Sequence, residues 1–338
     1  MGRFSASDCA APIAPEHFSV SIKPRNDLGL STDCSRPVNR IVRRLNQFLK
    51  MKELSMKVTG LNIHPLKSGR AIARETVSVN LDGVEGDRRF MLIQPDGRFI
   101  TQRELQTLAQ VEASHIDGGV HLRMGEREIS VRFDPDRRLN VVVWGSEVDA
   151  AVSDETTDEV LSSWFGRPVR LAHMDASAER LVGAEWAGAA APVGFADGFP
   201  ILITTTGSLA DLNRTLGEKG QEPVGMERFR TNILVDCGEA WEEDFWESVE
   251  IGGIRFDLVK PCSRCIMTTQ DQITGERIGG NPIQGLAEKR MSADRRVTGV
   301  LFGWNAVPRS EGTVKLGDEV KIIGRRGERW PMKVRASA

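Results

Sequence analysis

The pattern of apolar and polar positions from residue 56 to about 174 predicts a series of short strands. Apolar residues recur in brief runs that Gly, Asp or Pro interrupts at intervals of roughly 8–12 residues. The runs lie at 58–63, 77–81, 90–101 and 140–152, with three further short strands that turn at 117–119 and 125–126 and end near Phe133. Such spacing is typical of a barrel or sandwich and differs from alternating strands and helices. One helix is expected in this part, from Thr156 to Phe165.

The second half of the chain again predicts strands with a few short helices. The expected strands are 201–204, 233–235, 249–259, 300–302 and 313–323. Gly252-Gly253 and Gly317-Asp318 are expected to turn two hairpins, and Ser208 is expected to cap a helix. The Ala/Gly-rich stretch 175–196 is interpreted as a linker. The predicted fold is therefore mainly β with short helices (α+β), in two barrel-like domains at 56–175 and 195–326.

Residues 1–55 form a leader of different character. Residues 1–36 show no periodicity, which indicates disorder, whereas 37–52 combine apolar residues on one helical face with Arg and Lys on the rest. A basic amphipathic helix can make peripheral contact with an anionic membrane or serve in targeting. It can equally be a solvated helix, or sequence upstream of a true start at Met51 or Met56.

Composition narrows the function class. The net charge of −2 does not favour a nucleic-acid partner, and no apolar run is long enough to span a membrane. The five cysteines are an odd number in a long chain. Together with the lack of a secretory signal pattern, this favours a reducing compartment, and we expect a cytoplasmic protein.

Cys262-Ser263-Arg264-Cys265, expected at the start of a loop after the predicted hairpin at 249–259, is the strongest chemical signal. A lone C-x-x-C can belong to a zinc site or a redox dithiol, or it can be two buried small hydrophobic residues. The five histidines have no ligand-like spacing to the pair, and no convincing helix begins after Cys265. Arg264 favours a thiolate, and a thiolate beside anion-binding groups suits a soft-ligand metal carried by an anionic organic cofactor.

Three other cations stand near predicted strand ends, two of them beside Ser or Thr. They are Lys67, Arg88 and Arg230. Each taken alone can be an ordinary solvated strand end. If they converge with Arg264, they form a pocket for a polar ring system that bears a phosphate.

These residues carry a resemblance to the MOSC-domain family, in the branch with a MOSC N-terminal β-barrel domain. That branch includes the mitochondrial amidoxime-reducing proteins and their bacterial relatives. The matching segments are His64–Ser68, Asp87-Arg88, Phe195–Pro200, Ser208–Asn213, Phe229–Asn232 and Cys262–Cys265. They occur in the family's order and span about residues 57 to 325.

The resemblance implies a molybdenum cofactor (molybdopterin) and a reductase that transfers oxygen from the N–O bonds of small N-hydroxylated compounds. It implies that Cys265 ligates the metal, and Asp197 is a candidate proton relay, although an aspartate that forms a turn is the simpler interpretation. The implied cofactor contacts are Lys67, Ser68, Arg88, Thr205, Thr206, Arg230, Asn232, Ser263 and Arg264. A non-catalytic carrier of the cofactor or of sulfur is the alternative, and pyridoxal phosphate binding is a looser association within the fold group.

Two features depart from the family pattern. Asn281-Pro282-Ile283 stands where Glu-Pro-Leu is common, which bears on the rim of the active site and on substrate preference. The chain also lacks the cysteine spacing of the iron–sulfur domain that several bacterial relatives carry. We therefore expect no iron–sulfur cluster and a separate electron-donor protein of the reductase, cytochrome or ferredoxin type.

Overall fold

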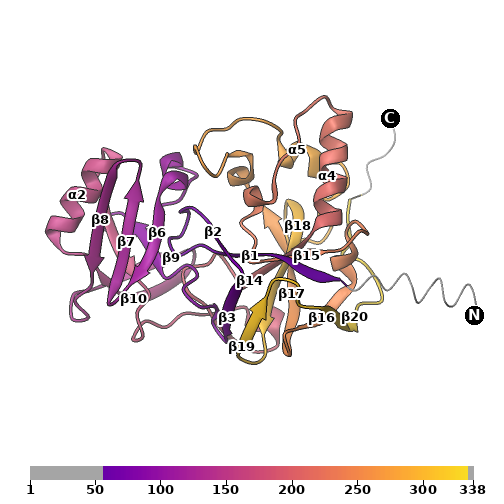
Figure 1. Cartoon of the computed structure of the whole chain (residues 1–338), viewed down its shortest axis with the longest axis horizontal. Coiled ribbons are helices and arrows are strands. Elements are labelled where there is room, and N and C mark those ends of the chain that lie inside the picture. The colour runs from indigo at the N-terminus through magenta and orange to yellow at the C-terminus, as the bar shows by residue number, and fades with distance from the viewer. Residues whose placement is uncertain (1–55, 334–338) are drawn as a thin grey trace, which may run out of the picture. The chain divides into compact units, whose positions relative to one another are not determined.

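The computed structural model describes residues 56–333. The predicted leader, including the basic segment 37–52, lies outside the described residues. Figure 1 shows that the described part is built mainly of strands with short helices, which confirms the predicted fold class. None of its helices is long and apolar enough to span a membrane.

An eight-stranded sheet organises the larger part of the structure. Its order is β2 (Ile72–Arg74), β1 (Lys57–Ile63), β15 (Ile233–Asp236), β14 (Ile201–Thr205), β18 (Val300–Pro308), β17 (Ile254–Arg264), β16 (Trp246–Ile251) and β20 (Val320–Arg325). Only the β14–β15 pair of this sheet is parallel. Its apolar face packs around two buried tryptophans, Trp246 and Trp304.

Strands from the beginning and the end of the described chain share sheets. β1 pairs with β15, and β3 (Thr76–Asn80) pairs with β19 (Gly312–Lys315) and with β4 (Gly83–Val84). The alternating Val77 and Val79 are buried in the core of the eight-stranded sheet, whereas Leu81 lies in a turn and is exposed. Residues 57–84 therefore pack with the C-terminal half, and the domain boundaries at 175 and 195 stay a prediction.

The intervening residues form smaller sheets with their own core. One has the order β5 (Phe90–Ile93), β11 (Arg170–His173), β10 (Ser146–Val152) and β9 (Arg138–Val143). The other has the order β6 (Glu112–Ile116), β7 (Gly119–Met124) and β8 (Arg127–Arg132). The predicted helix is present as α2 (Glu155–Phe165), which Asp154 caps.

The predicted linker has structure of its own. Within it lie the paired strands β12 (Leu181–Val182) and β13 (Ala191–Pro192) and the short helix α3 (Ala184–Ala187). Arg180 is buried and donates to the carbonyl oxygen of Gly194 at 3.0 Å. Hydrogen bonds therefore fix the backbone of the segment that precedes Asp197.

The C-terminal half also contains short helices. They are α4 (Thr206–Glu218), α5 (Pro282–Leu286) and the 3₁₀ turns η2 (Met226–Phe229), η3 (Glu242–Phe245) and η4 (Ile266–Thr269), whereas the 3₁₀ turn η1 (Gln106–Gln110) lies in the N-terminal half. The predicted cap of α4 was wrong: Thr205 is the N-cap, and its hydroxyl accepts from the amide of Ser208. Ser208 lies inside the first turn, where its own hydroxyl meets the buried Glu243 at 2.7 Å.

Two further predictions need correction. The turn at Gly317-Asp318 does not close a hairpin, because β19 pairs with β3 while β20 pairs with β16. The cysteines do not begin a loop either, since β17 continues through Arg264 and pairs with β18. A register shift between Pro261 and Ser263 lets the strand continue past a residue that lacks an N–H donor.

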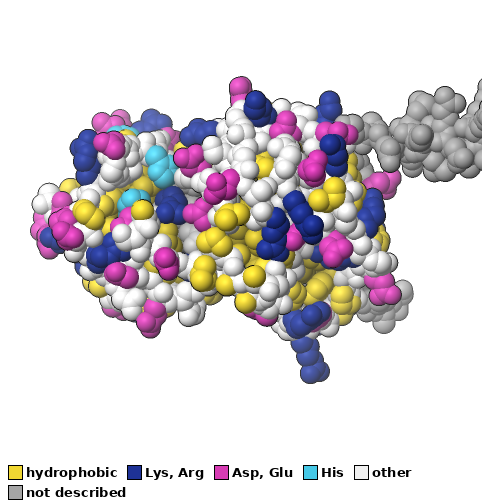
Figure 2. Space-filling view, turned by 90° about the horizontal axis from the view of Figure 1, so that it is seen from below, with side chains coloured by type: hydrophobic (Ala, Val, Ile, Leu, Met, Phe, Trp, Pro, Cys, Tyr) yellow, Lys and Arg dark blue, Asp and Glu magenta, His cyan; other side chains and the backbone are white. Residues whose placement is uncertain are grey.

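Charges of both signs are interspersed on the face shown in Figure 2. That face therefore presents no continuous basic patch of the kind that attracts a nucleic-acid backbone. This agrees with the net charge of −2.

Candidate functional site

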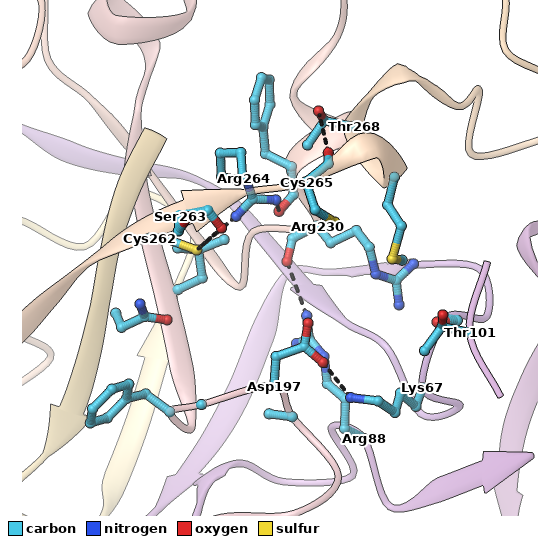
Figure 3. Close-up of a pocket in the computed structure, with 18 of the residues that line it drawn as sticks. Lys67, Arg88, Thr101, Asp197, Arg230, Cys262, Ser263, Arg264, Cys265 and Thr268 are labelled. Atoms are coloured by element: carbon cyan, nitrogen blue, oxygen red, sulfur yellow. Dashed lines mark hydrogen bonds and ion pairs between the residues drawn. The ribbon is translucent and has the colours of Figure 1, made fainter. Parts of the chain in front are cut away.

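A cavity of about 290 Å³ lies where the end of β17 faces the loops after β1 and β4. Figure 3 shows Cys262 to Cys265 on one side of it, with Lys67, Arg88 and Asp197 opposite. The predicted site residues that line it are Lys67, Ser68, Arg88, Asp197, Arg230, Asn232, Ser263, Arg264 and Cys265. The fold thus brings together groups from both ends of the described chain.

Backbone strain is concentrated at this cavity. Ser68, Arg88 and Arg230 have φ angles of 65°, 47° and 55°, in the left-handed region that side chains rarely adopt. They are three of the five described residues other than glycine with positive φ. Strained backbone persists where the surroundings enforce it, and it clusters at functional sites. Ser68, Arg88 and Arg230 therefore adopt backbone conformations that residues with a side chain disfavour.

Lys67 brings a buried ammonium group to the cavity. Its Nζ donates to the carbonyl oxygen of Phe195 at 2.7 Å and forms an ion pair with Asp197. Burial lowers the pKa of Lys67, and Asp197 opposes that shift. Desolvation at the edge of the cavity raises the pKa of Asp197, but Lys67 and Arg103 outweigh it and hold the pKa below its usual range. Asp197 is therefore ionised at neutral pH.

Arg88 is anchored by groups on both sides. It forms an ion pair with Asp87, and its Nη1 and Nη2 donate to Asn232 Oδ1 at 3.2 Å and to the Arg230 carbonyl oxygen at 3.1 Å. Burial raises the pKa of Asp87, but Arg88 and His64 outweigh it and lower the pKa to about 2. Asn232 is thus used to position Arg88 as well as to line the cavity.

Several guanidinium nitrogens at the cavity have no hydrogen-bond partner among residues 56–333. These buried donors are Arg228 Nε and Nη1, Arg230 Nη2 and Arg264 Nε. Arg230 donates through Nη1 to the Gly69 carbonyl oxygen at 2.6 Å, and burial together with Arg88 lowers its pKa to about 9. It remains charged at neutral pH. Buried polar groups in proteins almost always have partners, so these donors fit an anionic ligand with several acceptor atoms.

The two cysteines of the C-x-x-C have different environments. Arg264 Nη1 lies 2.9 Å from Cys262 Sγ, whereas Arg103 Nη2 lies 3.3 Å from Cys265 Sγ. Both thiols are free, and only the single turn η4 follows Cys265. No group of three or more His, Cys, Asp or Glu side chains is arranged to hold a metal ion within the described range. Cys265 lies after the last strand residue, beside the unpaired guanidinium donors.

Two predicted cofactor contacts lie away from the cavity. The Thr205 hydroxyl meets Glu243 Oε2 at 2.9 Å, and the Thr206 hydroxyl meets Asp236 Oδ1 at 3.0 Å. The cavity opens at the other end of β14, where Leu202 lines it. β14 is five residues long, so Thr205 and Thr206 lie at the end of the strand opposite the cavity. There they begin α4 and bond to nearby acceptors.

Asn281 is also away from the cavity, so its departure from the family pattern does not alter the cavity wall. Its side chain caps α5 and accepts from the amides of Ile283 and Gln284 at 3.1 and 3.3 Å. A carboxylate at this position could accept the same two bonds.

Arg103, Arg228 and Thr101 line the cavity but were not predicted from the sequence. Arg228 precedes the predicted Phe229–Asn232 segment by one residue, so its nearness in sequence was a usable signal. No local sequence signal indicated Arg103, because its partner Cys265 lies 162 residues away.

Two family models match consecutive parts of the chain. The MOSC N-terminal beta barrel domain matches residues 55–168, and the MOSC domain matches residues 190–321. Mitochondrial amidoxime-reducing component 1 of Danio rerio is 28% identical over 285 residues, which cover 79% of this chain and 84% of that protein. The human protein of the same name is 28% identical over 290 residues, with coverages of 79% and 83%.

A third relative matches over a smaller share of its own length. Human molybdenum cofactor sulfurase is 28% identical over 254 residues, which cover 69% of this chain and 28% of that protein. The similarity is therefore confined to a minor part of the sulfurase.

Proposed function

Since the chain belongs to the MOSC family, with a MOSC N-terminal barrel domain ahead of the MOSC domain, we propose that it reduces N-hydroxylated compounds with a molybdenum cofactor. The observation that carries this proposal is the set of unpaired buried guanidinium donors around a cavity that also contains a free cysteine. Reduction of an N-hydroxylated compound agrees with the name of the amidoxime-reducing relatives, and association with the cofactor agrees with the name of the sulfurase.

In this proposal the cationic wall binds the anionic part of the cofactor, and Cys265 supplies a thiolate to the metal. An oxyanion can accept hydrogen bonds from the free N–H groups of Arg228, Arg230 and Arg264. When bound, the cofactor would supply two-electron chemistry, so that N–OH, two electrons and two protons give N–H and water. Arg88 and Asn232 are already bonded to each other, which keeps the wall in place before binding.

The Lys67–Asp197 pair is our candidate for proton supply. The Asp197 side chain is 60% exposed and accepts from Lys67, whose ammonium is buried. Because the pKa of Asp197 is held below its usual range, the proton of the pair resides on Lys67 Nζ, and burial, which lowers the pKa of Lys67, makes that proton easier to give up. Asp197 then links this ammonium to solvent and accepts a proton from it only transiently.

Reduction of a substrate also requires electrons from outside the cavity. We propose a separate electron-donor protein, since the proposed site contains only the one cofactor. The substrate is expected to be a small N-hydroxylated molecule, because the cavity measures about 290 Å³ and the cofactor takes part of the space.

Turnover of benzamidoxime by the full chain tests the proposal. We expect benzamidine to form when reduced methyl viologen is supplied to protein purified from a host that makes the cofactor. A carrier is the second candidate, favoured by the partial similarity to molybdenum cofactor sulfurase. It predicts transfer of cofactor to an apo-acceptor enzyme without benzamidine formation, and that outcome would replace the reductase proposal.

A further inference from the structure

Arg103 connects the N-terminal barrel region to the thiol of Cys265. It lies between β5 and η1, lines the cavity, and donates through Nη2 to Cys265 Sγ at 3.3 Å. No carboxylate within 4.0 Å pairs with it in the range 56–333. The sulfur is therefore the group toward which this guanidinium is directed.

A buried set of glutamines fixes the backbone next to Arg103. Gln102 Nε2 donates to the Ser68 carbonyl oxygen at 2.8 Å, and Gln270 Nε2 donates to the Gln102 carbonyl oxygen at 2.9 Å. Gln272 Nε2 adds a bond to Gln102 Oε1 at 3.3 Å. All three amides are buried. Since Gln270 and Gln272 follow Cys265 closely, the segment that carries Arg103 is tied to the segment that carries the thiol.

Trp144 stacks on the guanidinium of Arg103. Trp144 occupies a turn position where tryptophan is disfavoured. It is the first residue of the two-residue loop between β9 and β10, with φ 56°, where such turns prefer Gly. Half of its surface is exposed, so burial does not explain it. Its ring lies 4.8 Å from the Arg103 guanidinium carbon, and its Nε1 donates to Asp197 at 3.3 Å.

We propose that Arg103, held by Trp144, is a positioning residue for the Cys265 sulfur. The guanidinium donates to the sulfur and keeps it directed into the cavity before the cofactor binds, and Trp144 restricts the guanidinium to that place by stacking. The proposal deepens the proposed function, on which its relevance to catalysis rests. The contact itself is a property of this chain and can be tested without cofactor.

Site-resolved alkylation of the cofactor-free full chain tests the contact. Iodoacetamide is applied at one neutral pH, and mass spectrometry measures the rates at Cys262 and Cys265 separately. Because Arg103 holds the sulfur toward the cavity through which the reagent enters, Arg103→Met should slow labelling of Cys265 by at least about threefold and leave Cys262 unchanged. Arg103→Lys should restore most of the rate, since it retains a hydrogen-bond donor at the end of a long side chain.

The pair of cysteines supplies its own control. Arg264→Met should slow labelling of Cys262, whose sulfur lies 2.9 Å from Arg264 Nη1, more than that of Cys265. An unchanged Cys265 rate in Arg103→Met would overturn the proposal. Equal slowing at both cysteines would also overturn it, because Arg103 would then act only on the fold. Neither result depends on whether the protein is a reductase.

Trp144 variants separate positioning from stability. Trp144→Gly removes a side chain from a position where Gly is favoured, so we expect an unchanged or higher melting temperature together with slower Cys265 labelling. Trp144→Phe keeps a stacking ring and should retain most of the labelling rate. In the loaded enzyme, Arg103→Met should lower the midpoint potential of the metal, because a hydrogen bond to the ligating sulfur is lost. Labelling at the wild-type rate in Trp144→Gly would contradict the role given to Trp144.

Discussion

The cavity and a second buried polar cluster use the same residue types but differ in how the charges are paired. In the second cluster, which we call the Asp244 network, Arg290 donates both terminal nitrogens to Asp244 at 2.6 and 2.9 Å. Trp304 Nε1 adds a bond to Asp244 at 3.0 Å. At the cavity, by contrast, Arg228 and Arg230 retain terminal nitrogens that no described residue accepts.

This difference separates a cluster that stabilises the fold from one that is suited to a ligand. Arg290 and Asp244 balance each other's charge in the Asp244 network, although Arg290 Nε has no acceptor among residues 56–333, so removal of one partner leaves a buried charge unpaired. The cavity has an excess of cations, and an added anion would complete it. The same substitution of arginine should therefore have opposite consequences in the two places.

The largest effect is expected at the cavity thiol. Cys265→Ser should reduce benzamidoxime turnover to background and abolish molybdenum retention, since a neutral hydroxyl is a poor ligand for a soft metal site. Cys262→Ser should keep most of both properties. Equal loss in the two variants, measured as turnover and metal content, would contradict the assignment of a single ligand.

Breaking the Asp244 network should cost stability instead of activity. Arg290→Met leaves Asp244 buried and unpaired, which is expected to lower the free energy of unfolding by about 3–5 kcal/mol. Urea denaturation measures the change. Turnover per folded molecule should remain near that of the wild type, and Arg290→Met with Asp244→Leu should recover part of the loss. A fall in turnover without a fall in stability would break the comparison.

The matching substitution at the cavity should show the reverse. Arg230→Met removes a buried cation that lacks a full set of partners, so we expect the free energy of unfolding to change by no more than about 1 kcal/mol. Cofactor retention should fall about 10–100-fold, as for loss of a supporting contact in other metal sites. Metal analysis after gel filtration provides the measurement, and strong destabilisation with full cofactor content would contradict it.

The sequence predicted more of the residues that line the cavity than of the residues that hold them in position. Lys67 and Arg230 were found because a cation next to hydroxyl or amide residues at a strand end is a local signal, and Arg88 because it stands next to Arg89 at the entry to a strand. Thr205 and Thr206 are also hydroxyl residues at a strand end, yet they lie at the opposite end of β14 and start a helix. The Arg103–Cys265 contact depends on glutamine bonds between segments more than 160 residues apart, so no local pattern indicates it.

A smaller effect is expected from Glu243, which borders the Asp244 network. Burial and the neighbouring Asp244 raise the pKa of Glu243 above its ordinary value of 4.5. The folded state therefore binds the proton more tightly, and this contribution to stability is complete at low pH and lost as pH rises from 4.5 through the raised pKa. Glu243→Gln cannot ionise at this position, so the variant should not lose this stability as the pH rises. The difference between the melting temperatures of the variant and the wild type should therefore shift in favour of the variant between pH 5 and 7. A constant difference across this range would exclude the raised pKa.

The smallest effect concerns Asn281, where the family commonly has Glu. Asn281→Asp preserves the cap of α5 and should change the free energy of unfolding by no more than about 0.5 kcal/mol. Benzamidoxime kinetics should also be unchanged, because the residue lies outside the cavity. A marked change in KM would show that α5 reaches the substrate.

The central claim is that the unpaired donors at the cavity are completed by an anionic molybdenum cofactor. The most direct measurement is the molybdenum and pterin content of the full chain purified from a host that makes the cofactor. We predict equimolar molybdenum and pterin that stay with the wild-type chain and with Arg290→Met, but are lost from Arg230→Met. A wild-type chain that retains neither molybdenum nor pterin would contradict the account.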